Sequence, residues 1–449
     1  MKKPTPKNEE SPFNFNELFF STTNKRGVIE YGNSVFVRVS NYPAEELMGA
    51  AHSIIRHPDM PRCVFKVFWD YLNSNKPIGA YVKNMAADGR YYWVYAFAFP
   101  VQGGYLSIRF KPSSPLFETV KKIYDDVLKK EKQTSMDEAL KYLIETLNQN
   151  GFDDYSDFMV AAAIQELEAR DAQLKKINRQ ATYSNSVLSH ISDISEKSNK
   201  ILDNNFAKTP IFTKGSQTFK YNLNLLRDEF QKLKFLSVNM NILAVNYGES
   251  AATLSVISEE FSKLATQIEV QVRTFSQFTE SLTEAIKKCS EILASLKVQM
   301  NMVDFFVKES IDNSDKSENA FEGMNRNKEM FTDLFKQSIS QLDSEMARLE
   351  VEMLQILDQI AGIKKLVRTL EIIKQTGAIE SSRQDDIKTS FNVYLQEMTS
   401  FLELLRKSIN EMGQQQTLLN QETKEIRESS DSIKNNVSQI FTMALESTT

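Results

Sequence analysis

Histidine, cysteine and closely spaced carboxylates are the side chains most able to do chemistry, and this chain has few of them in suitable arrangements. It has three histidines and two cysteines, Cys63 and Cys289, which lie far apart in the sequence. The chain contains no phosphate-binding loop, no Gly-x-Ser-x-Gly turn, no Cys/His metal spacing and no nucleotide cyclase signature. Its aspartate pairs sit in charged surroundings that are typical of solvated helix ends: Asp125-Asp126, Asp153-Asp154 and Asp385-Asp386. We therefore expect a protein that is not an enzyme.

A bound cofactor is the remaining route to chemistry, and histidine is the residue that would hold haem. His52 or His57 could serve as the axial ligand of a haem iron. His57 is followed by Pro58, which holds the backbone extended, and no apolar cleft can be identified around either histidine. Haem is therefore not the cofactor that we expect.

The composition divides the chain into a compact part and a helical part. Both tryptophans and ten of the eleven prolines precede residue 116, whereas the remainder is rich in Leu, Ile, Lys, Glu, Gln, Ser and Asn. The net charge of −5, from 54 basic and 59 acidic residues, provides no concentrated positive field for a phosphate backbone. Nucleic acid is therefore not an expected partner.

The same composition predicts a cytoplasmic protein without a membrane span. Two cysteines in different parts of the chain fit a reducing compartment. The basic N-terminus is not followed by the apolar segment of a signal peptide. No window approaches the ~18 to 20 apolar residues that a spanning helix needs.

The first hundred residues alternate between short β-type runs and short helical runs. A strand is expected at 27–31, and helical turns at 44–48 and 61–72, the second with Asp59 as its N-terminal cap. Turn signals then separate three further strands, at 78–85, 91–101 and 105–110. This order predicts an α+β domain in which an antiparallel sheet carries helices on one face.

Three segments of this region resemble the PAS domain of bacterial aerotaxis receptors, in the right order and over about 90 residues. They are 41–49, 52–61 with its Arg-His-Pro-Asp motif, and 82–94 with Asn84, Gly89 and Trp93. The resemblance implies a PAS domain that binds FAD. It also implies that the candidate cofactor-binding residues are Arg56, His57, Asp59, Asn84 and Trp93.

These residue types suit a flavin site, although each also has a simpler explanation. An arginine, an amide and a tryptophan could provide phosphate pairing, ring hydrogen bonding and stacking. Alternatively, Arg56 pairs with Asp59 at the surface, Trp93 is sheet core and Asn84 ends a strand. The sequence departs from the family after Pro77, where Ile78 replaces a tryptophan, and Tyr81 could compensate.

Beyond the loop at 111–115 the apolar residues recur every three or four positions, which predicts helices. Shorter helices are expected at 116–132 and 136–149, and another begins near Ser156 after a break at 151–155. Periodic apolar positions then continue to about Met443 among charged and amide side chains. Such a pattern buries only a narrow seam, so we expect an antiparallel coiled-coil or four-helix-bundle region.

One part of the helical region resembles the hairpin tip of methyl-accepting chemotaxis proteins. The matching segments are 239–249 and 256–265, and the resemblance implies a turn at Gly248 and Glu249. It also implies partner contacts at Asn239 and Ile242, with the kinase CheA and the coupling protein CheW as the type of partner. Leu243 and Asn246 replace the family's Glu and Arg, so ordinary kinase control is not expected.

A second stretch, 377–383, resembles the same tip and contains Ile379, Glu380 and Arg383. Placing Ile379 over Ile242 gives an offset of 379 − 242 = 137, and eight positions then match, which suggests an internal repeat. Apolar periodicity alone could also produce most of these matches. If the repeat is real, one chain carries two hairpins that pack into an intramolecular four-helix bundle, and a homodimer remains the other arrangement.

These observations predict five segments and leave two functions open. The segments are a disordered N-terminus (1–13), a PAS domain (14–115), a helical connector (116–160) and two hairpins (161–311 and 312–449). The first function is a sensor of redox state, oxygen or a small ligand that signals to a protein partner through helix packing. The second is a scaffolding protein whose PAS domain has no ligand.

Overall fold

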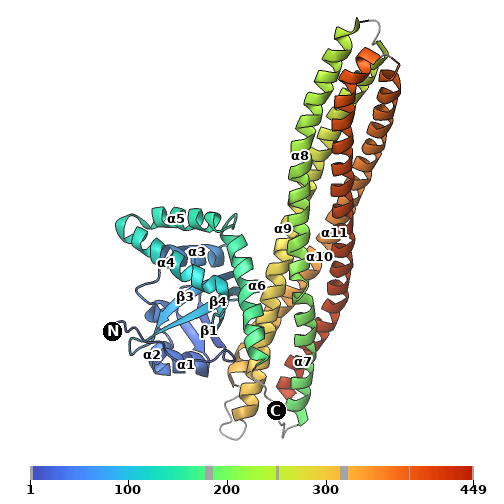
Figure 1. Ribbon diagram of the computed structural model, residues 1–449. Coiled ribbons are helices and arrows are strands. Elements are labelled where there is room, and N and C mark those ends of the chain that lie inside the picture. Colours follow the sequence, from blue (N-terminus) through green and yellow to red (C-terminus); the bar gives the residue numbers. More distant parts are fainter. Residues whose placement is uncertain (1–3, 177–185, 249–251, 314–321, 384, 447–449) are drawn as a thin grey trace. The chain divides into compact units, whose positions relative to one another are not determined.

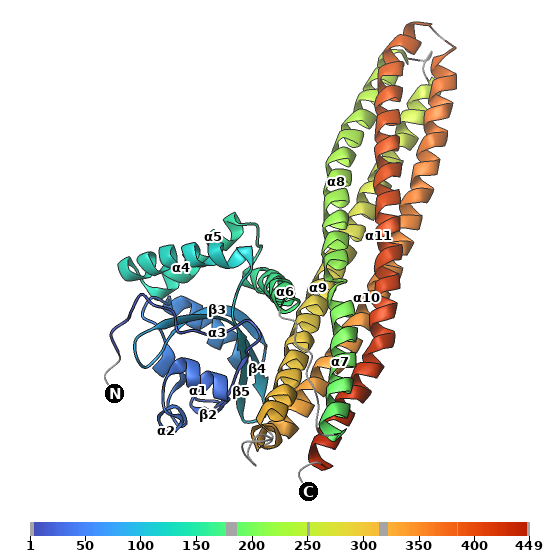
Figure 2. The ribbon, with the colours of Figure 1, turned by 60° about the horizontal axis from the view of Figure 1, so that its bottom comes forward.

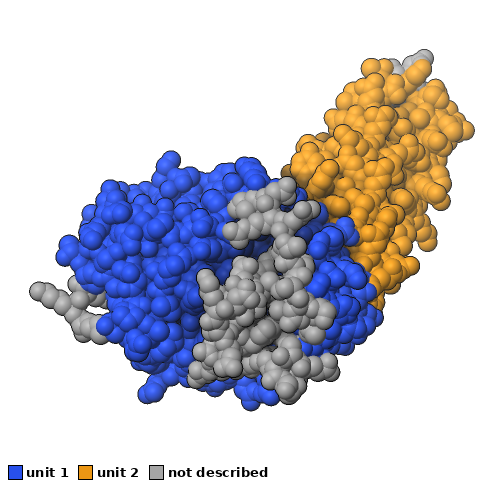
Figure 3. Space-filling view, turned by 90° about the horizontal axis from the view of Figure 1, so that it is seen from below, with its two compact units in different colours: residues 1–207, 290–342, 429–449 blue, residues 208–289, 343–428 orange. Residues whose placement is uncertain are grey.

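We describe the protein from a computed structural model. The structure describes residues 4–176, 186–248, 252–313, 322–383 and 385–446. The chain forms two compact units (Figure 3). Unit 1 contains residues 1–207, 290–342 and 429–449, and unit 2 contains residues 208–289 and 343–428.

Unit 1 is built around a five-stranded antiparallel sheet with the strand order β2-β1-β5-β4-β3 (Figure 1). Its strands are β1 (Phe19–Asn24), β2 (Ile29–Gly32), β3 (Ile78–Met85), β4 (Tyr91–Val101) and β5 (Gly104–Phe110). Because β5 pairs with both β1 and β4, the first strand of the domain lies beside the last.

Helices cover both faces of this sheet. The inner face packs against α1 (Ser34–Ser40), α2 (Ala44–Leu47), the 3-10 helix η1 (His52–Ile55) and α3 (Arg62–Asn73). The outer face contacts α4 (Pro115–Gln133) and α6 (Tyr155–Leu174), and α5 (Met136–Gln149) packs against α3 and α4. The expected helices on one face are present, and the connector helices cover the other.

The α+β prediction is confirmed, with differences in detail. Strands β3 and β4 have the predicted limits, but β1 and α1 were not predicted. Asp59 does not cap α3, since the N-cap position is Pro61, which makes no side-chain capping bond. Asp59 instead pairs with Lys83, with an O–N distance of 2.8 Å.

The remaining helices are long. They are α7 (Ser186–Phe206), α8 (Thr209–Asn246), α9 (Ala252–Asn313), α10 (Glu322–Ser381) and α11 (Asp385–Glu446). Pro210 lies in the first turn of α8, where its missing N–H costs no helical hydrogen bond. The first arm of hairpin 1 is not one continuous helix, because α6, α7 and α8 are separate elements.

Unit 2 is a four-helix bundle made by one polypeptide, in which α8 and parts of α9, α10 and α11 run side by side (Figure 2). Hydrogen bonds join each neighbouring pair: Ser216–Thr283 (α8–α9), Gln271–Gln359 (α9–α10), Lys374–Thr399 (α10–α11) and Asn222–Glu411 (α8–α11). In the core, the rings of Phe230 and Phe401 meet edge to face at 5.1 Å. Within unit 2, α8 and these parts of α9, α10 and α11 therefore pack on one another, and the division of the chain into two hairpins at 161–311 and 312–449 stays a prediction.

The burial of residues 137 positions apart supports the internal repeat. Leu226 and Ile363 are fully buried, as are Ile268 and Leu405. The exposed positions match as well, since the side chains of Ile242 and Ile379 are 55% and 60% exposed, and those of Val256 and Val393 are 60% and 55% exposed. Apolar periodicity accounts for shared buried positions, but it does not account for shared exposed apolar ones.

The two turns of the bundle differ. Gly248 has a φ of 62°, which fits its predicted role in a turn, whereas Glu249 lies outside the described residues. Gly377 lies inside α10 and its backbone approaches Phe391 of α11, so the second turn follows Ser381. Across the described ranges, no helix has a segment long and apolar enough to cross a membrane.

Candidate functional site

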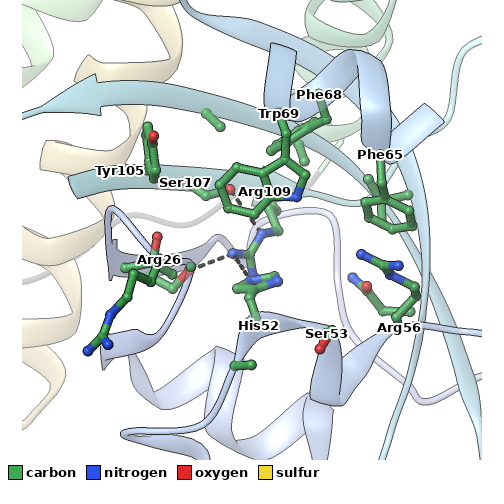
Figure 4. A pocket seen from close by; sticks show the side chains of 18 residues that line it. Arg26, His52, Ser53, Arg56, Phe65, Phe68, Trp69, Tyr105, Ser107 and Arg109 are labelled. Carbon is green, nitrogen blue, oxygen red and sulfur yellow. Dashed lines mark hydrogen bonds between the residues drawn. The ribbon is translucent and has the colours of Figure 1, made fainter. Parts of the chain in front are cut away.

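The inner face of the sheet borders a cavity of about 270 Å³ (Figure 4). Strands β1, β3, β4 and β5 contribute one side of it, and η1 and α3 contribute the other. This volume is close to the lower limit of about 300 Å³ for ligand pockets. The cavity could therefore hold one planar ring system, while the rest of a nucleotide would extend outside.

Small side chains create this space. Ala98 on β4 is paired in register with Ser107 on β5, and Ser107 is paired with Ser21 on β1. All three line the cavity, so a row of small residues crosses three adjacent strands. Facing them from α3 are Phe65, Phe68 and Trp69. The result is a slot between an aromatic surface and a floor of small residues.

Arg109 is the central polar group of the cavity (Figure 4). Its side chain is only 3% exposed, and the guanidinium lies 5.0 Å from the ring centre of Phe36. Nη2 bonds to Ser21 Oγ and lies 2.8 Å from His52 Nε2, while Nε donates to Ser107 Oγ at 3.0 Å. Nη1 is buried and has no hydrogen-bond partner among the residues that the structure describes.

The charges around the cavity are positive. Burial lowers the pKa of Arg109 to about 10, so the guanidinium remains cationic at neutral pH. Burial, and then the charges of Arg109 and Arg56, lower the pKa of His52 well below its usual value. His52 is therefore neutral, and its Nε2 accepts the hydrogen bond from Arg109. None of the residues that line the cavity is Asp or Glu.

Arg56 and Asn84 are the two predicted site residues that line the cavity. Their backbones form an antiparallel bridge, which ties the Arg-His-Pro-Asp segment to β3. The Arg56 guanidinium lies 3.9 Å from the ring centre of Phe65, and Asn84 is 2% exposed. Both positions suit the predicted roles in ligand binding.

His57 and Asp59 do not line the cavity. His57 is 3% exposed, and its Nδ1 accepts a hydrogen bond from the Asp59 backbone N–H at 3.1 Å. Burial and the charge of Lys83 lower the pKa of His57 to about 4, and the charge of Asp59 acts in the opposite direction. These residues hold the segment in place, since Asp59 also pairs with Lys83 on β3.

Tyr81 and Trp93 point away from the cavity, to the outer face of the sheet. The ring of Tyr81 stacks on Phe117 of α4 at 5.5 Å, and Trp93 meets the same ring edge to face at 5.4 Å. Successive side chains of a strand point to opposite faces, so Tyr81 and Asn84, three positions apart, face opposite ways. This alternation was readable in the sequence.

Tyr81 also belongs to a buried polar contact between the sheet and the connector helices. The carboxylate of Glu166 on α6 is fully buried and accepts hydrogen bonds from Tyr81 Oη at 2.9 Å and Ser114 Oγ at 2.6 Å. It also accepts from the backbone N–H of Ser113 at 2.7 Å. Because Ser114 is the N-cap of α4, one carboxylate joins β3, α4 and α6.

Three central residues of the cavity lining were not predicted from the sequence as ligand-binding residues. Trp69 and Arg109 were not predicted at all, and His52 was considered only as a haem ligand. A signal for Arg109 existed, because Ser107 and Arg109 alternate with Leu106, Ile108 and Phe110 along β5. An arginine on the polar side of a strand that is otherwise apolar points to a special environment.

The predicted partner-contact residues lie on the surface of unit 2. Asn239 and Ile242 are exposed on α8, and Ile379 is exposed on α10. Arg383 pairs with Glu380 at 3.0 Å. Apolar side chains at heptad spacing continue this surface along α8: Phe235, Val238, Ile242 and Val245.

The lining of the cavity fits a flavin ring in its chemistry. Trp69 and the phenylalanines of α3 provide aromatic surface, and the unsatisfied Nη1 of Arg109 provides a donor for a ring oxygen or nitrogen. Arg26 is exposed where it lines the cavity, so it could meet a phosphate. The residues present are therefore compatible with a flavin nucleotide.

Comparison with known proteins identifies the class of the domain. Residues 29–106 match the family model described as the PAS fold. Together with the five-stranded antiparallel sheet, this match shows that the first part of the chain is a PAS domain.

The relatives of this region include a sensor and several photoreceptors. The aerotaxis receptor of Escherichia coli is 35% identical over 121 residues, which are 26% of this chain and 24% of that receptor. The chain therefore matches about a quarter of the receptor's length. The light-state structure of the blue-light photoreceptor Aureochrome1 LOV is 19% identical and covers 26% of this chain and 91% of its own, with a TM-score of 0.20. The photo-excited blue-light photoreceptor Vivid is 18% identical over 25% of this chain and 88% of its own, with a TM-score of 0.18.

Proposed function

We propose that this protein is a non-enzymatic sensor whose PAS cavity binds a flavin, with FAD as the first candidate. In this proposal the state of the flavin is relayed through the connector helices to the helical region, which contacts a protein partner. The observation that carries the proposal is the pair of buried polar sites on opposite faces of the same sheet. One is Arg109 in the cavity, and the other is Glu166 beneath α4.

The cavity residues suggest how a flavin would be held. Trp69 and Phe65 would cover the ring system, Asn84 and Arg109 would bond to its polar edge, and Arg26 and Arg56 would meet the phosphates. A bound flavin would supply reversible redox chemistry, which is the means of sensing oxygen or redox state. Trp69 would supply the aromatic surface that is absent at Ile78. Haem is less well supported, because His52 Nε2 already faces the Arg109 guanidinium.

Strand β3 offers a direct path from the cavity to the helices. Val82 and Asn84 line the cavity, while Tyr81 and Lys83 face the other way. A shift of β3 on a change of ligand state would change the bond from Tyr81 to Glu166, and so the packing of α4 and α6. Two-state repacking of helices at a polar contact is an adequate switch.

The partner that we propose is a signalling protein of the CheA or CheW type. Its support is the tip resemblance together with the exposed Ile242 and Ile379, which occupy equivalent positions in the two halves of the bundle. Surface apolar groups of this kind are typical of protein contacts. The similarity to the aerotaxis receptor lies in the PAS region, so the proposed class of partner is supported by the tip residues alone.

An absorption spectrum of the purified full chain tests the flavin. We expect flavin bands between about 350 and 500 nm, or their appearance after FAD is added. The matched control is Ala96→Phe, which places a ring inside the cavity and should abolish the bands without unfolding the domain. A flavin that remains bound to this variant lies elsewhere, which would contradict the proposed site.

The second function is a scaffold whose PAS domain has no ligand. It is favoured by the small volume of the cavity and by the replacement of charged tip residues at Leu243 and Asn246. A purified chain that is colourless and takes up neither FAD nor FMN would support this function over the first. A pull-down with residues 160–449 would then identify the partner in either case.

A further inference from the structure

The cavity contains a buried positive charge, and the described residues that line it include no Asp or Glu. Arg109 makes its hydrogen bonds to two serines and to the neutral His52, and its guanidinium lies near the ring of Phe36. None of these partners carries a negative charge, and no Asp or Glu lines the cavity. The charge therefore has hydrogen-bond partners but no counter-ion within the cavity lining.

Such an arrangement is unfavourable unless something else provides the negative charge. Burying an ionised group without a counter-ion is unfavourable, and a buried donor without an acceptor adds to that cost. Nη1 of Arg109 is such a donor. A glutamine could bridge the same serines without a charge, so a purely structural role would not require an arginine here.

The residues around Arg109 hold its guanidinium in a fixed orientation beside the cavity. Ser21, Ser107 and His52 hold Nη2 and Nε from three different elements, which fixes the plane of the guanidinium. Trp69 and the small residue Ala98 border the same space (Figure 4). A planar ligand in this slot would present its edge to a fixed cation.

We propose that Arg109 is an anion-recognition residue, and that the ligand of this cavity is a planar aromatic group that carries a negative charge on the edge beneath Trp69. This inference extends the proposed function, and it depends on that function only for identifying the ligand as a flavin. For a flavin, the relevant form is the fully reduced ring. The oxidised ring takes up two electrons and one proton at N5, N1 stays deprotonated, and the ring becomes anionic. Arg109 would then bind the reduced flavin more tightly than the oxidised one.

If the chain binds flavin, a redox titration with dithionite as the reductant tests the inference. Arg109→Gln is expected to weaken binding of reduced flavin at least about tenfold more than binding of oxidised flavin, which lowers the two-electron midpoint potential by about 30 mV or more. Arg109→Lys keeps the charge and should recover most of the potential. An unchanged potential in Arg109→Gln that still binds flavin would overturn the inference and leave the proposed function standing.

If the chain binds no flavin, a matched pair of small probes tests the same residue. Calorimetry of the full chain with 2-naphthoate and with its uncharged analogue 2-naphthamide compares two ligands of one shape. We expect the carboxylate to bind at least about tenfold more tightly, as a charge-assisted contact implies. That preference should disappear in Arg109→Gln and persist in Arg109→Lys. Equal binding of the two probes, or binding of neither, would overturn the inference.

Two controls separate recognition from folding. Lys25→Gln removes a positive charge from an exposed position outside the cavity lining, where water screens it, and should change the ratio of reduced to oxidised flavin affinity, or the probe preference, by less than about threefold. The circular dichroism of each variant shows whether the sheet has formed. If Arg109→Gln does not fold, the preference of the parent chain for 2-naphthoate over 2-naphthamide decides, because a structural role for Arg109 predicts equal binding of the two probes.

Discussion

The two faces of the PAS sheet differ in what the side chains at the middle of β4 and β5 contact. The inner face has small side chains and a buried charge around a cavity, with Ala96, Ala98 and Arg109 at its centre. The outer face carries large rings that pack against α4 and α6, such as Tyr81 and Tyr95. One face is therefore built to receive a ligand, and the other to hold helices.

This difference shows how a small domain can separate sensing from output. A strand residue contacts one face only, but its backbone is shared, so a displacement caused at Val82 or Asn84 reaches Tyr81 directly. On the outer face, this displacement would change the buried hydrogen bonds that Tyr81 and Ser114 donate to Glu166. Substitutions on the two faces should therefore change the free energy of unfolding by unequal amounts.

The largest expected effect comes from removing a ring of the outer face. Tyr95 is fully buried, and its hydroxyl donates to the Met159 carbonyl of α6 at 3.0 Å. Tyr95→Ala should lower the free energy of unfolding of the PAS domain by about 3 to 5 kcal/mol. Urea unfolding followed by tryptophan fluorescence measures this, because both tryptophans, Trp69 and Trp93, lie in the domain.

On the inner face, the matched substitution is Ala96→Phe, which adds an aromatic ring. Ala96→Phe should alter the same unfolding free energy by less than about 1 kcal/mol, because the cavity can accept the added side chain that a filled core would not. A loss from Ala96→Phe as large as that from Tyr95→Ala would mean that the inner face is as tightly packed as the outer one.

An effect smaller than that of Tyr95→Ala is expected at the polar contact on the outer face. Glu166→Ala leaves the hydroxyl of Tyr81 and the N–H of Ser113 without their acceptor, which should cost about 2 to 4 kcal/mol. Tyr81→Phe removes a single hydroxyl and should cost about 1 kcal/mol. The double variant gives the control, because its cost should be less than the sum of the two if the groups interact.

The pH dependence of stability comes next in size and concerns His57. Its pKa in the folded protein is about 4, below the ordinary value of 6.5, because of burial and the nearby charge of Lys83. Between these pH values the unfolded chain binds more protons than the folded one, so stability falls as the pH drops from about 6.5 to 4. We expect a loss on the order of 2 to 3 kcal/mol, and His57→Gln should reduce this slope. The pKa of His52 is also lowered, so His52 adds to the same loss of stability at low pH. If His57→Gln alone removed the whole slope, the lowered pKa of His52 would be contradicted.

The smallest effect is expected from Lys83, whose ion pair with Asp59 joins β3 to the Arg-His-Pro-Asp segment. Asp59 is half exposed, so Lys83→Met should cost less than about 1 kcal/mol. The same variant removes the positive charge that lowers the pKa of His57, so this pKa should rise from about 4. A titration of the His57 ring by nuclear magnetic resonance would detect the change, and an unchanged pKa would assign the whole shift to burial.

The parts of the fold that the sequence predicted are those with strong local signals. Turn residues separate β3, β4 and β5, and their limits were found almost to the residue. Strand β1 reads Phe-Phe-Ser-Thr-Thr-Asn and is buried on both faces, so it has no alternation to recognise. Helix α1 contains three valines, which have low helix propensity, and it begins because Asn33 caps it by accepting from the Phe36 N–H.

The candidate site was less predictable because it depends on which face each side chain takes. Arg56 and Asn84 were found through a resemblance to a family, which carries residue identity but no orientation. Tyr81 and Trp93 have suitable chemistry and lie on the wrong side of the sheet to line the cavity. Arg109 becomes recognisable only when β1 and β5 are paired, since Arg109 and Ser107 lie on β5 and its other serine partner, Ser21, lies on β1.

Amide hydrogen exchange in the two redox states tests the relay between the faces most directly. The flavin-loaded full chain, before and after reduction with dithionite, should differ in exchange at residues 113–133 and 155–174, which contain α4 and α6, as well as around the cavity. Tyr81→Phe should weaken the change in the helices and leave the change at the cavity intact. Identical exchange of α4 and α6 in both states, while the cavity residues differ, would contradict the account.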